Sequence, residues 1–100
     1  METLTQNFDA QMHQVYERAK DQDYFATQFK GMLDQYGGVE TAKRLLSKSQ
    51  PQTGLFRLWE LKLLDSSMEA LVIQERFNDL FTTEEINRAR QRLEELGYFD

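Results

Sequence analysis

Apolar residues recur every three or four positions along most of this chain, the spacing that places them on one face of an α-helix. The densest stretch is residues 55–64, where only Arg57, Glu60 and Lys62 interrupt a run of leucine, phenylalanine and tryptophan. A helix that is apolar nearly all round is normally covered on several sides. The pattern therefore predicts a single all-α domain of five or six short helices, packed around a central apolar helix at about residues 54–64.

The helices before this segment are predicted from their apolar stripes and their stop signals. A first helix is expected at about residues 3–20, a second from Asp23 to the glycines at 37 and 38, and a third at about residues 39–47. Asp23 is the expected N-cap of the second helix. Residues 48–54 contain the only proline and form the one clear loop of the chain. No stretch predicts a strand.

Two capping boxes are expected in the second half of the chain. In a capping box a Ser or Thr and a Glu three residues later each bind the other's free backbone N–H group. Ser66 and Glu69 have this spacing and predict the start of a helix. Thr82 and Glu85 repeat the spacing, with apolar residues at 81 and 86 in the positions of a hydrophobic staple. The helix that begins there is expected to end at Gly97.

Composition bounds the class of protein. The chain has 100 residues, of which 40% are hydrophobic, and it has no cysteine. This length suits one domain. The lack of cysteine excludes disulfides, thiolate nucleophiles and Cys-based zinc sites, and it favours a reducing compartment. The acidic, polar N-terminus lacks a signal-peptide pattern, and no apolar run approaches the about 20 residues that span a bilayer. We therefore expect a soluble, cytoplasmic protein.

Residue types that carry chemistry are few. His13 is the only histidine and lies off the apolar stripe of its helix, so we expect it at the surface and not in a metal site. Glu84, Arg88, Arg92 and Glu95 share one face of the last helix at spacings typical of solvated ion pairs. No glycine-rich phosphate loop and no glycine-flanked nucleophile turn is present. We expect no enzymatic activity, no cofactor, no metal and no small-molecule substrate.

Glu60 is the carboxylate that stands out, because it lies on the mostly apolar helix expected at residues 54–64. A buried carboxylate needs a partner, which Arg44 or Arg57 can supply. Glu60 and Arg44 form the candidate buried ion pair. A structural ion pair or a partly exposed position is favoured over a catalytic acid.

The net charge of −5 is unevenly distributed, since residues 38–62 carry five basic and two acidic side chains. Candidate contacts to phosphate or to a partner are Lys43, Arg44, Lys48, Arg57 and Lys62. The overall acidity argues against non-specific binding to nucleic acid. The loop of seven residues at 48–54 and the apolar helix after it also differ from a helix-turn-helix motif.

Residues 37–98 carry a further pattern. It reads Gly-Gly-Val-Glu-Thr-Ala-Lys-Arg-Leu-Leu at 37–46, Gly-Leu-Phe-Arg-Leu-Trp-Glu at 54–60 and Leu-Phe-Thr-Thr-Glu-Glu at 80–85. In these strings the chain resembles a family of small uncharacterised bacterial proteins of similar length. The resemblance implies a bacterial or phage source and a stand-alone helical domain, and it carries over no activity, ligand or site residue.

The charged residues of this pattern surround the predicted central helix and its two junctions. They are Lys43, Arg44, Glu60, Asp65 and Glu69. Two interpretations stay open for them: a buried network that stabilises the fold, or a shared binding surface.

Aromatic residues supply the candidate anchors for a protein partner. Trp59, Phe25 and Phe29 suit this role because aromatic side chains dominate interface hot spots, but their helical spacing inside apolar stripes favours core packing. The leading hypothesis is a small interaction or regulatory module that binds another protein or forms a homodimer. The alternative is a nucleic-acid-associated protein that uses the basic stretch 43–62.

Overall fold

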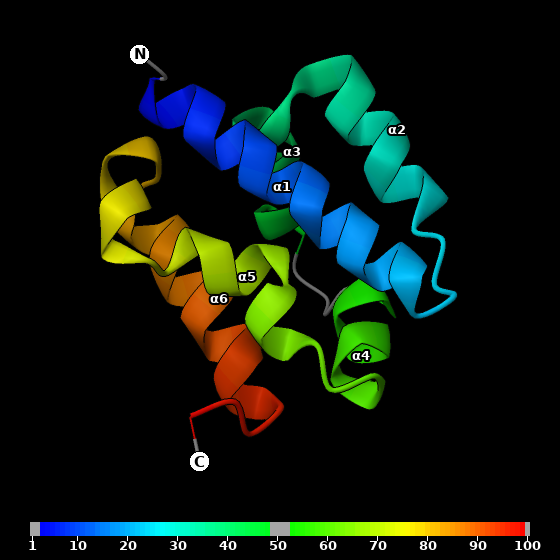
Figure 1. Cartoon of the computed structure of the whole chain (residues 1–100). Helices are drawn as coiled ribbons and strands as arrows, with labels where there is room; N and C mark the ends of the chain where they lie inside the picture. The colour runs from blue at the N-terminus through cyan, green and yellow to red at the C-terminus, as the bar shows by residue number, and fades with distance from the viewer. Residues whose placement is uncertain (1–2, 49–52, 100) are drawn as a thin grey trace.

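In the computed structural model, which describes residues 3–48 and 53–99, the chain forms six α-helices and two 3₁₀ segments, and none of these residues is in a strand. The elements are α1 (Leu4–Asp21), α2 (Thr27–Tyr36), α3 (Gly38–Leu46), α4 (Thr53–Glu60), the 3₁₀ segment η1 (Leu64–Ser66), α5 (Met68–Val72), the 3₁₀ segment η2 (Glu75–Leu80) and α6 (Thr83–Glu95). Figure 1 shows their arrangement. The predicted all-α class and the single small domain of short helices are confirmed.

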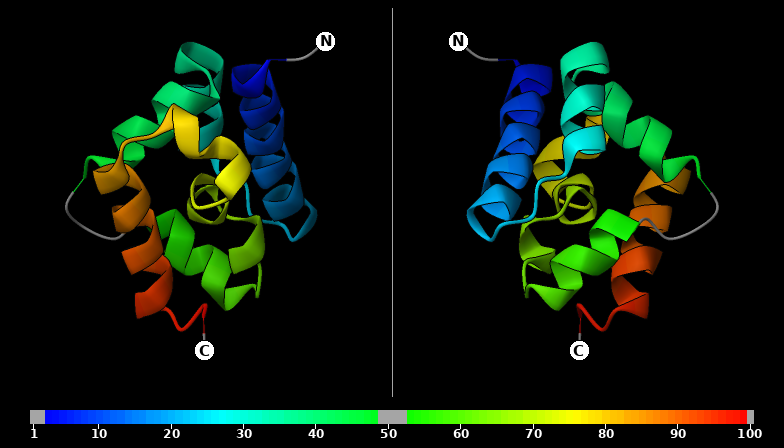
Figure 2. Two further views of the ribbon diagram at one scale, coloured as in Figure 1. Left: turned by 90° about the vertical axis from the view of Figure 1, so that its left-hand side faces the viewer. Right: turned by 90° about the vertical axis from the view of Figure 1, so that its right-hand side faces the viewer.

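The centre of the fold is α5. All five of its residues are buried, including Val72, which has no exposed surface. Helices α1 and α6 pack against α5 together with both 3₁₀ segments. Figure 2 shows α5 nearly end-on in the middle of the surrounding helices. Five residues form less than two helical turns, so α5 depends on this packing for its stability.

The expected central position of the helix at 54–64 is wrong. Helix α4 ends at Glu60 and buries only one side, through Leu55 and Leu58. Its other apolar side carries Phe56 and Trp59, which are 50% and 43% exposed. Helix α4 therefore lies at the edge of the molecule (Figure 1), because apolar periodicity does not show which apolar face meets a neighbour.

A turn after α4 accounts for its early end. Lys62 adopts φ 62°, the left-handed conformation that usually favours glycine at a helix C-terminus. The Leu63 N–H group donates to the Leu58 carbonyl over 2.8 Å, and Lys62 N donates to Trp59 O over 3.1 Å. These two bonds close the helix and turn the chain towards η1. The apolar run therefore continues beyond the helix that it marks.

Local capping signals were predicted with mixed success. The Thr82–Glu85 capping box of α6 is confirmed, with Glu85 N donating to Thr82 Oγ1 over 3.2 Å and Thr82 N donating to Glu85 Oε1 over 2.8 Å. The expected box of Ser66 and Glu69 is wrong. Ser67 caps α5 instead, by accepting from the Ala70 N–H group over 3.1 Å. Glu69 is thereby free for a different partner.

The start of α2 also differs from the prediction. Asp23 does not cap it, because Asp23 has φ 63° and the helix begins four residues later, at Thr27. An aspartate tolerates this left-handed conformation better than most residues. Residues 22–26 therefore form a short connection between α1 and α2, and Phe25 in it is 55% exposed.

The main core joins α1 to the second half of the chain. Phe8 packs edge-on against Phe77 at 5.0 Å and against Phe81 at 5.1 Å between ring centres. A smaller cluster of Leu55, Ala70 and Leu93 covers the other side of α5, and Tyr98 folds back onto it. Most of the loop expected at 48–54 lies outside the described residues. Among the helices that the structure describes, none is long and apolar enough to cross a membrane.

Candidate functional site

A buried ion pair links α5 to α6. Arg92 Nη1 donates to Glu69 Oε2 over 3.2 Å, and the side chains of Arg92 and Glu69 are only 7% and 4% exposed. The second guanidinium nitrogen of Arg92 donates to the carbonyl oxygens of Leu45 at 3.1 Å and Lys48 at 2.7 Å. One arginine thus contacts a buried carboxylate and two backbone carbonyls at the end of α3.

A second arginine of α6 reaches the same end of α3. Arg88 Nη1 donates to the Leu46 carbonyl over 2.7 Å. The last carbonyls of a helix lack partners within the helix and carry partial negative charge. Arg88 and Arg92 supply both hydrogen-bond donors and positive charge there, so they attach the C-terminus of α3 to α6.

Burial raises the pKa of the Glu69 carboxyl above its ordinary value of 4.5, although Arg92 and a backbone N–H group act in the opposite direction. The geometry explains why Arg92 does not compensate fully. It offers Glu69 one hydrogen bond of 3.2 Å, while its other nitrogen serves two carbonyls. A bidentate pair would stabilise the carboxylate more strongly. Glu69 is thus a buried carboxylate with incomplete pairing.

Glu69 also lines a pocket of about 450 Å³ between α1, α2, α4 and α5. Volumes of about 300–1,000 Å³ are typical of small-molecule sites. The walls are mainly apolar and include four aromatic residues, which are Tyr16, Tyr24, Phe25 and Phe29. Glu69 and Lys48 are the charged residues that line it, and Lys48 is exposed to solvent.

The candidate basic surface does not present five unpaired cations. Lys43 Nζ lies 2.7 Å from Glu85 Oε1, and Arg44 Nε lies 3.0 Å from Glu40 Oε1. Arg57 lies 3.8 Å from Glu60. The Arg44 guanidinium also stacks on the Tyr36 ring at 4.0 Å. Lys48 and Lys62 are exposed, and Lys48 lies at the pocket.

The expected buried ion pair of Glu60 and Arg44 is wrong. The side chains of both residues are about half exposed, at 48% for Glu60 and 50% for Arg44. Helix α4 presents Glu60 to solvent because it buries the opposite side, with Leu55 and Leu58. The buried ion pair of this fold is formed by Glu69 and Arg92 instead.

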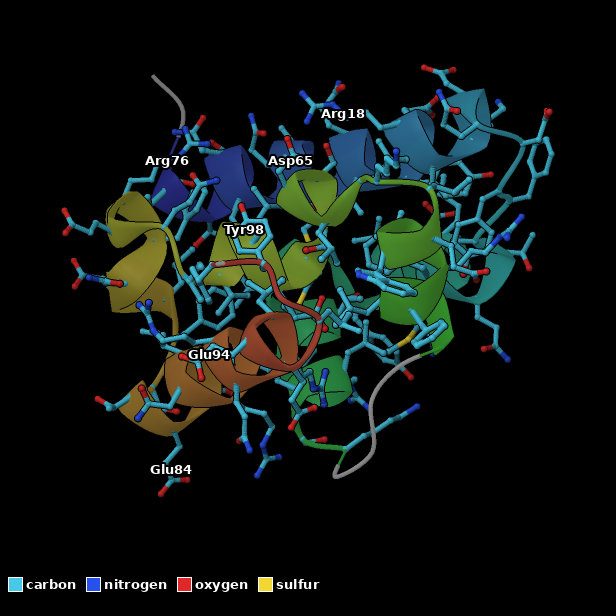
Figure 3. The ribbon with its side chains drawn as sticks, turned by 90° about the horizontal axis from the view of Figure 1, so that it is seen from below. Arg18, Asp65, Arg76, Glu84, Glu94 and Tyr98 are labelled. Carbon is cyan, nitrogen blue, oxygen red and sulfur yellow. The ribbon has the colours of Figure 1, made fainter. Side chains whose placement is uncertain are left out.

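The arginines were missed because Arg92 was assigned to the outer face of the last helix. That assignment holds for Glu84, which is exposed and points away from the protein in Figure 3, but not for Arg92, which is 6% exposed. Two sequence signals were available. Arg92 follows Ala89 by three residues on the apolar stripe, and Glu69 is the single charge in the apolar run 68–72.

The remaining candidates have simple surroundings. His13 is a surface residue as expected, and its Nε2 lies 3.6 Å from Asp9 with both side chains 40% exposed. Within residues 3–48 and 53–99 no cluster of three or more His, Cys, Asp or Glu residues forms a metal site. Of the predicted aromatic anchors, Phe29 is half-buried at the pocket, while Phe25 and Trp59 are exposed. Trp59 packs against Phe56 at 5.1 Å between ring centres.

Figure 3 also shows the side of the molecule where α1 passes η1, marked by Arg18 and Asp65. There Arg18 Nη1 donates to Ser66 Oγ over 3.0 Å. This bond attaches the segment before α5 to α1.

The fold is a small all-α domain with a mainly apolar pocket. Comparisons with protein family models, with curated proteins and with solved structures find no match to this chain. The function therefore has to be inferred from the geometry.

Proposed function

We propose that this protein is a non-enzymatic binding module that acts by binding another protein, and that the aromatic pair Phe56–Trp59 on α4 is its anchor. The observation that carries the proposal is the exposure of this pair, at 50% and 43%, on a helix whose other side is buried. Large aromatic side chains are enriched at the centres of protein interfaces, where they bury much area at low entropic cost. Phe56 and Trp59 therefore offer an exposed aromatic surface that a protein partner can cover.

The charges around the pair fit the same role. Arg57 and Glu60 lie on the same short helix and form an exposed ion pair at 3.8 Å. An apolar centre with a polar, solvated edge is the usual anatomy of a protein interface. Exposed ion pairs of this sort contribute little to stability, so they are available to set orientation towards a partner.

Binding is favoured over catalysis by the residues that line the pocket. Glu69 is the one carboxylate among the described residues there, and neither histidine nor serine accompanies it. General acid–base or nucleophilic chemistry requires a second group in reach of the reacting atom, and within the described part of the chain no hydrogen bond joins Glu69 to Tyr16, Tyr24 or Lys48, which line the same pocket. The nucleic-acid alternative is weaker, because Lys43, Arg44 and Arg57 each lie within 4 Å of a carboxylate.

A second copy of the chain is the first partner to test. Light scattering after size-exclusion chromatography, at low and high salt, measures the mass of the species in solution. We expect a dimer that persists at high salt, because an apolar interface is not screened and the net charge of −5 opposes self-association most at low salt.

Variants of the aromatic pair test the anchor. Phe56→Ala and Trp59→Ala should each shift the population to monomer, while Phe99→Ala, which removes another exposed aromatic, should leave it unchanged. If the wild-type protein is a monomer, the same variants are compared with it in capture experiments with a heterologous partner. Capture that is equally strong with Phe56→Ala and Trp59→Ala as with the wild type would refute the anchor.

A further inference from the structure

Glu69 gives the pocket a buried hydrogen-bond acceptor. Glu69 is 3% exposed, and its Oε2 accepts from Arg92 over 3.2 Å. No described residue donates a side-chain hydrogen bond to its other carboxylate oxygen, Oε1. A buried carboxylate is stabilised by each additional donor, and burial raises the pKa of Glu69 although a backbone N–H group and Arg92 act in the opposite direction. The pocket therefore has a polar group that favours a hydrogen-bond donor.

The walls of the pocket add a second preference. Tyr16, Tyr24, Phe25 and Phe29 contribute four aromatic rings to one cavity. The face of an aromatic ring attracts a cation, most strongly where water is excluded. At Tyr16 the ammonium group of Lys30, which is hydrogen-bonded to Asp34, lies 6.0 Å from the centre of the ring.

The charges of the pocket favour a cation over an anion. A ligand carboxylate would meet the buried charge of Glu69, whereas a ligand ammonium would complete its pairing. Two opposing charges lie nearby: Arg92 is buried beside Glu69 but is not among the residues that line the pocket, and Lys48 lines the pocket but is exposed to solvent, where interactions between charges are weakened by water and salt. Among the described residues, Glu69 is therefore the buried charged side chain that a ligand meets in the pocket.

We propose that this pocket is a binding site for a small organic ammonium ion that carries an aromatic or branched aliphatic group. The ammonium donates to Glu69 Oε1, and the apolar group packs among the rings of the pocket. This site is distinct from the proposed protein-binding surface, because Phe56 and Trp59 are not among the residues that line the pocket. The two proposals can therefore fail separately.

The test uses three probes of similar size. They are 2-phenylethylammonium, the neutral 2-phenylethanol and the anion 3-phenylpropionate, each titrated into the full chain at pH 7 and constant ionic strength. Proton–nitrogen NMR spectra follow the backbone amides. We expect saturable shifts at pocket residues such as Ala19, Phe29 and Glu69, with the ammonium binding about tenfold more tightly than the alcohol, as for one charge-assisted hydrogen bond.

Two variants separate the charge from the rings. Glu69→Gln should weaken the ammonium about tenfold and leave the alcohol unchanged. Phe29→Leu does not touch the ion pair, so it keeps the test valid if Glu69→Gln fails to fold, and it should weaken the ammonium several-fold. Glu94→Gln removes an exposed carboxylate on α6 and is the matched control that should leave ammonium binding unchanged.

Three results would overturn the proposal. The first is equal or tighter binding of 3-phenylpropionate. The second is an ammonium affinity that neither Glu69→Gln nor Phe29→Leu lowers. The third is the absence of saturable ammonium binding at the pocket, including shifts spread over exposed carboxylates only.

Discussion

Replacing Arg92 by methionine keeps an unbranched side chain but removes the cation that accompanies buried Glu69. The two side chains are 7% and 4% exposed, so water cannot take the place of the guanidinium without rearrangement. Removing one member of a buried ion pair typically costs about 3–5 kcal/mol. The carbonyls of Leu45 and Lys48 also lose their donor, at about 1 kcal/mol for each hydrogen bond. We therefore expect Arg92→Met to lower the free energy of unfolding by at least about 3 kcal/mol.

The double variant Glu69→Gln/Arg92→Met identifies the cause of this loss. It has no uncompensated buried charge, which is the reason that breaking a buried pair costs about 3–5 kcal/mol, so it should be more stable than Arg92→Met. A domain of this size has a free energy of unfolding of about 5–15 kcal/mol, so the loss expected for Arg92→Met is a large part of the total.

Urea unfolding followed by far-ultraviolet circular dichroism measures these free energies, with Arg90→Met as the control. Arg90 lies on the same helix and is exposed, so its replacement should change stability by at most about 1 kcal/mol. The reasoning would be refuted by a loss for Arg92→Met no larger than that for Arg90→Met. It would also be refuted by a double variant that is less stable than Arg92→Met.

Three further predictions concern pH, packing and capping. Because burial raises the pKa of Glu69 in the folded state, its ionisation should reduce stability as pH rises above about 4.5 through the folded pKa, and urea titrations at several pH values should show this slope flattened in Glu69→Gln. Gly38→Ala should destabilise the fold by about 1–3 kcal/mol, because the added Cβ would lie 2.9 Å from the Asp9 backbone. Gly31→Ala in α2 adds a Cβ that meets nothing within 4 Å, so it should stabilise the fold by about 0.5–1 kcal/mol. A lower free energy of unfolding in urea for Gly31→Ala than for the wild type would contradict this prediction. Thr82→Ala should lower thermal stability by about 1 kcal/mol through loss of the α6 cap, and an unchanged melting temperature would show that the cap is dispensable.

Local features of the chain explain which predictions succeeded. The Thr82–Glu85 box lies within four residues, so its side chains and backbone groups meet as soon as the helix starts. Phe8 and Leu93 belong to apolar stripes whose period alone assigns them to a buried face, and both have no exposed surface. Such signals depend on spacing along the chain and need no knowledge of the other helices.

The candidate site depends on contacts that no local pattern contains. Glu69 and Arg92 are 23 residues apart, and Arg92 and Leu45 are 47 apart. On its own helix, the spacing of Arg92 is that of a solvent-exposed residue, so it was predicted at the surface. Glu60 was predicted as the buried carboxylate, because it lies on the most apolar helix. Only the packing of α6 across α5 and the end of α3 buries Arg92 and gives Glu69 its partner.

The sequence by itself determined the all-α class and the start of α6, because helical period and capping act over a few residues. The tertiary structure decided that α5, not the more apolar α4, lies at the centre, and that Glu69 reaches a pocket. The physical reason is that burial depends on which faces meet. A helix with two apolar faces has the same sequence pattern whether its aromatic face packs against another helix or is exposed to solvent. In this protein the aromatic face, with Phe56 and Trp59, is exposed.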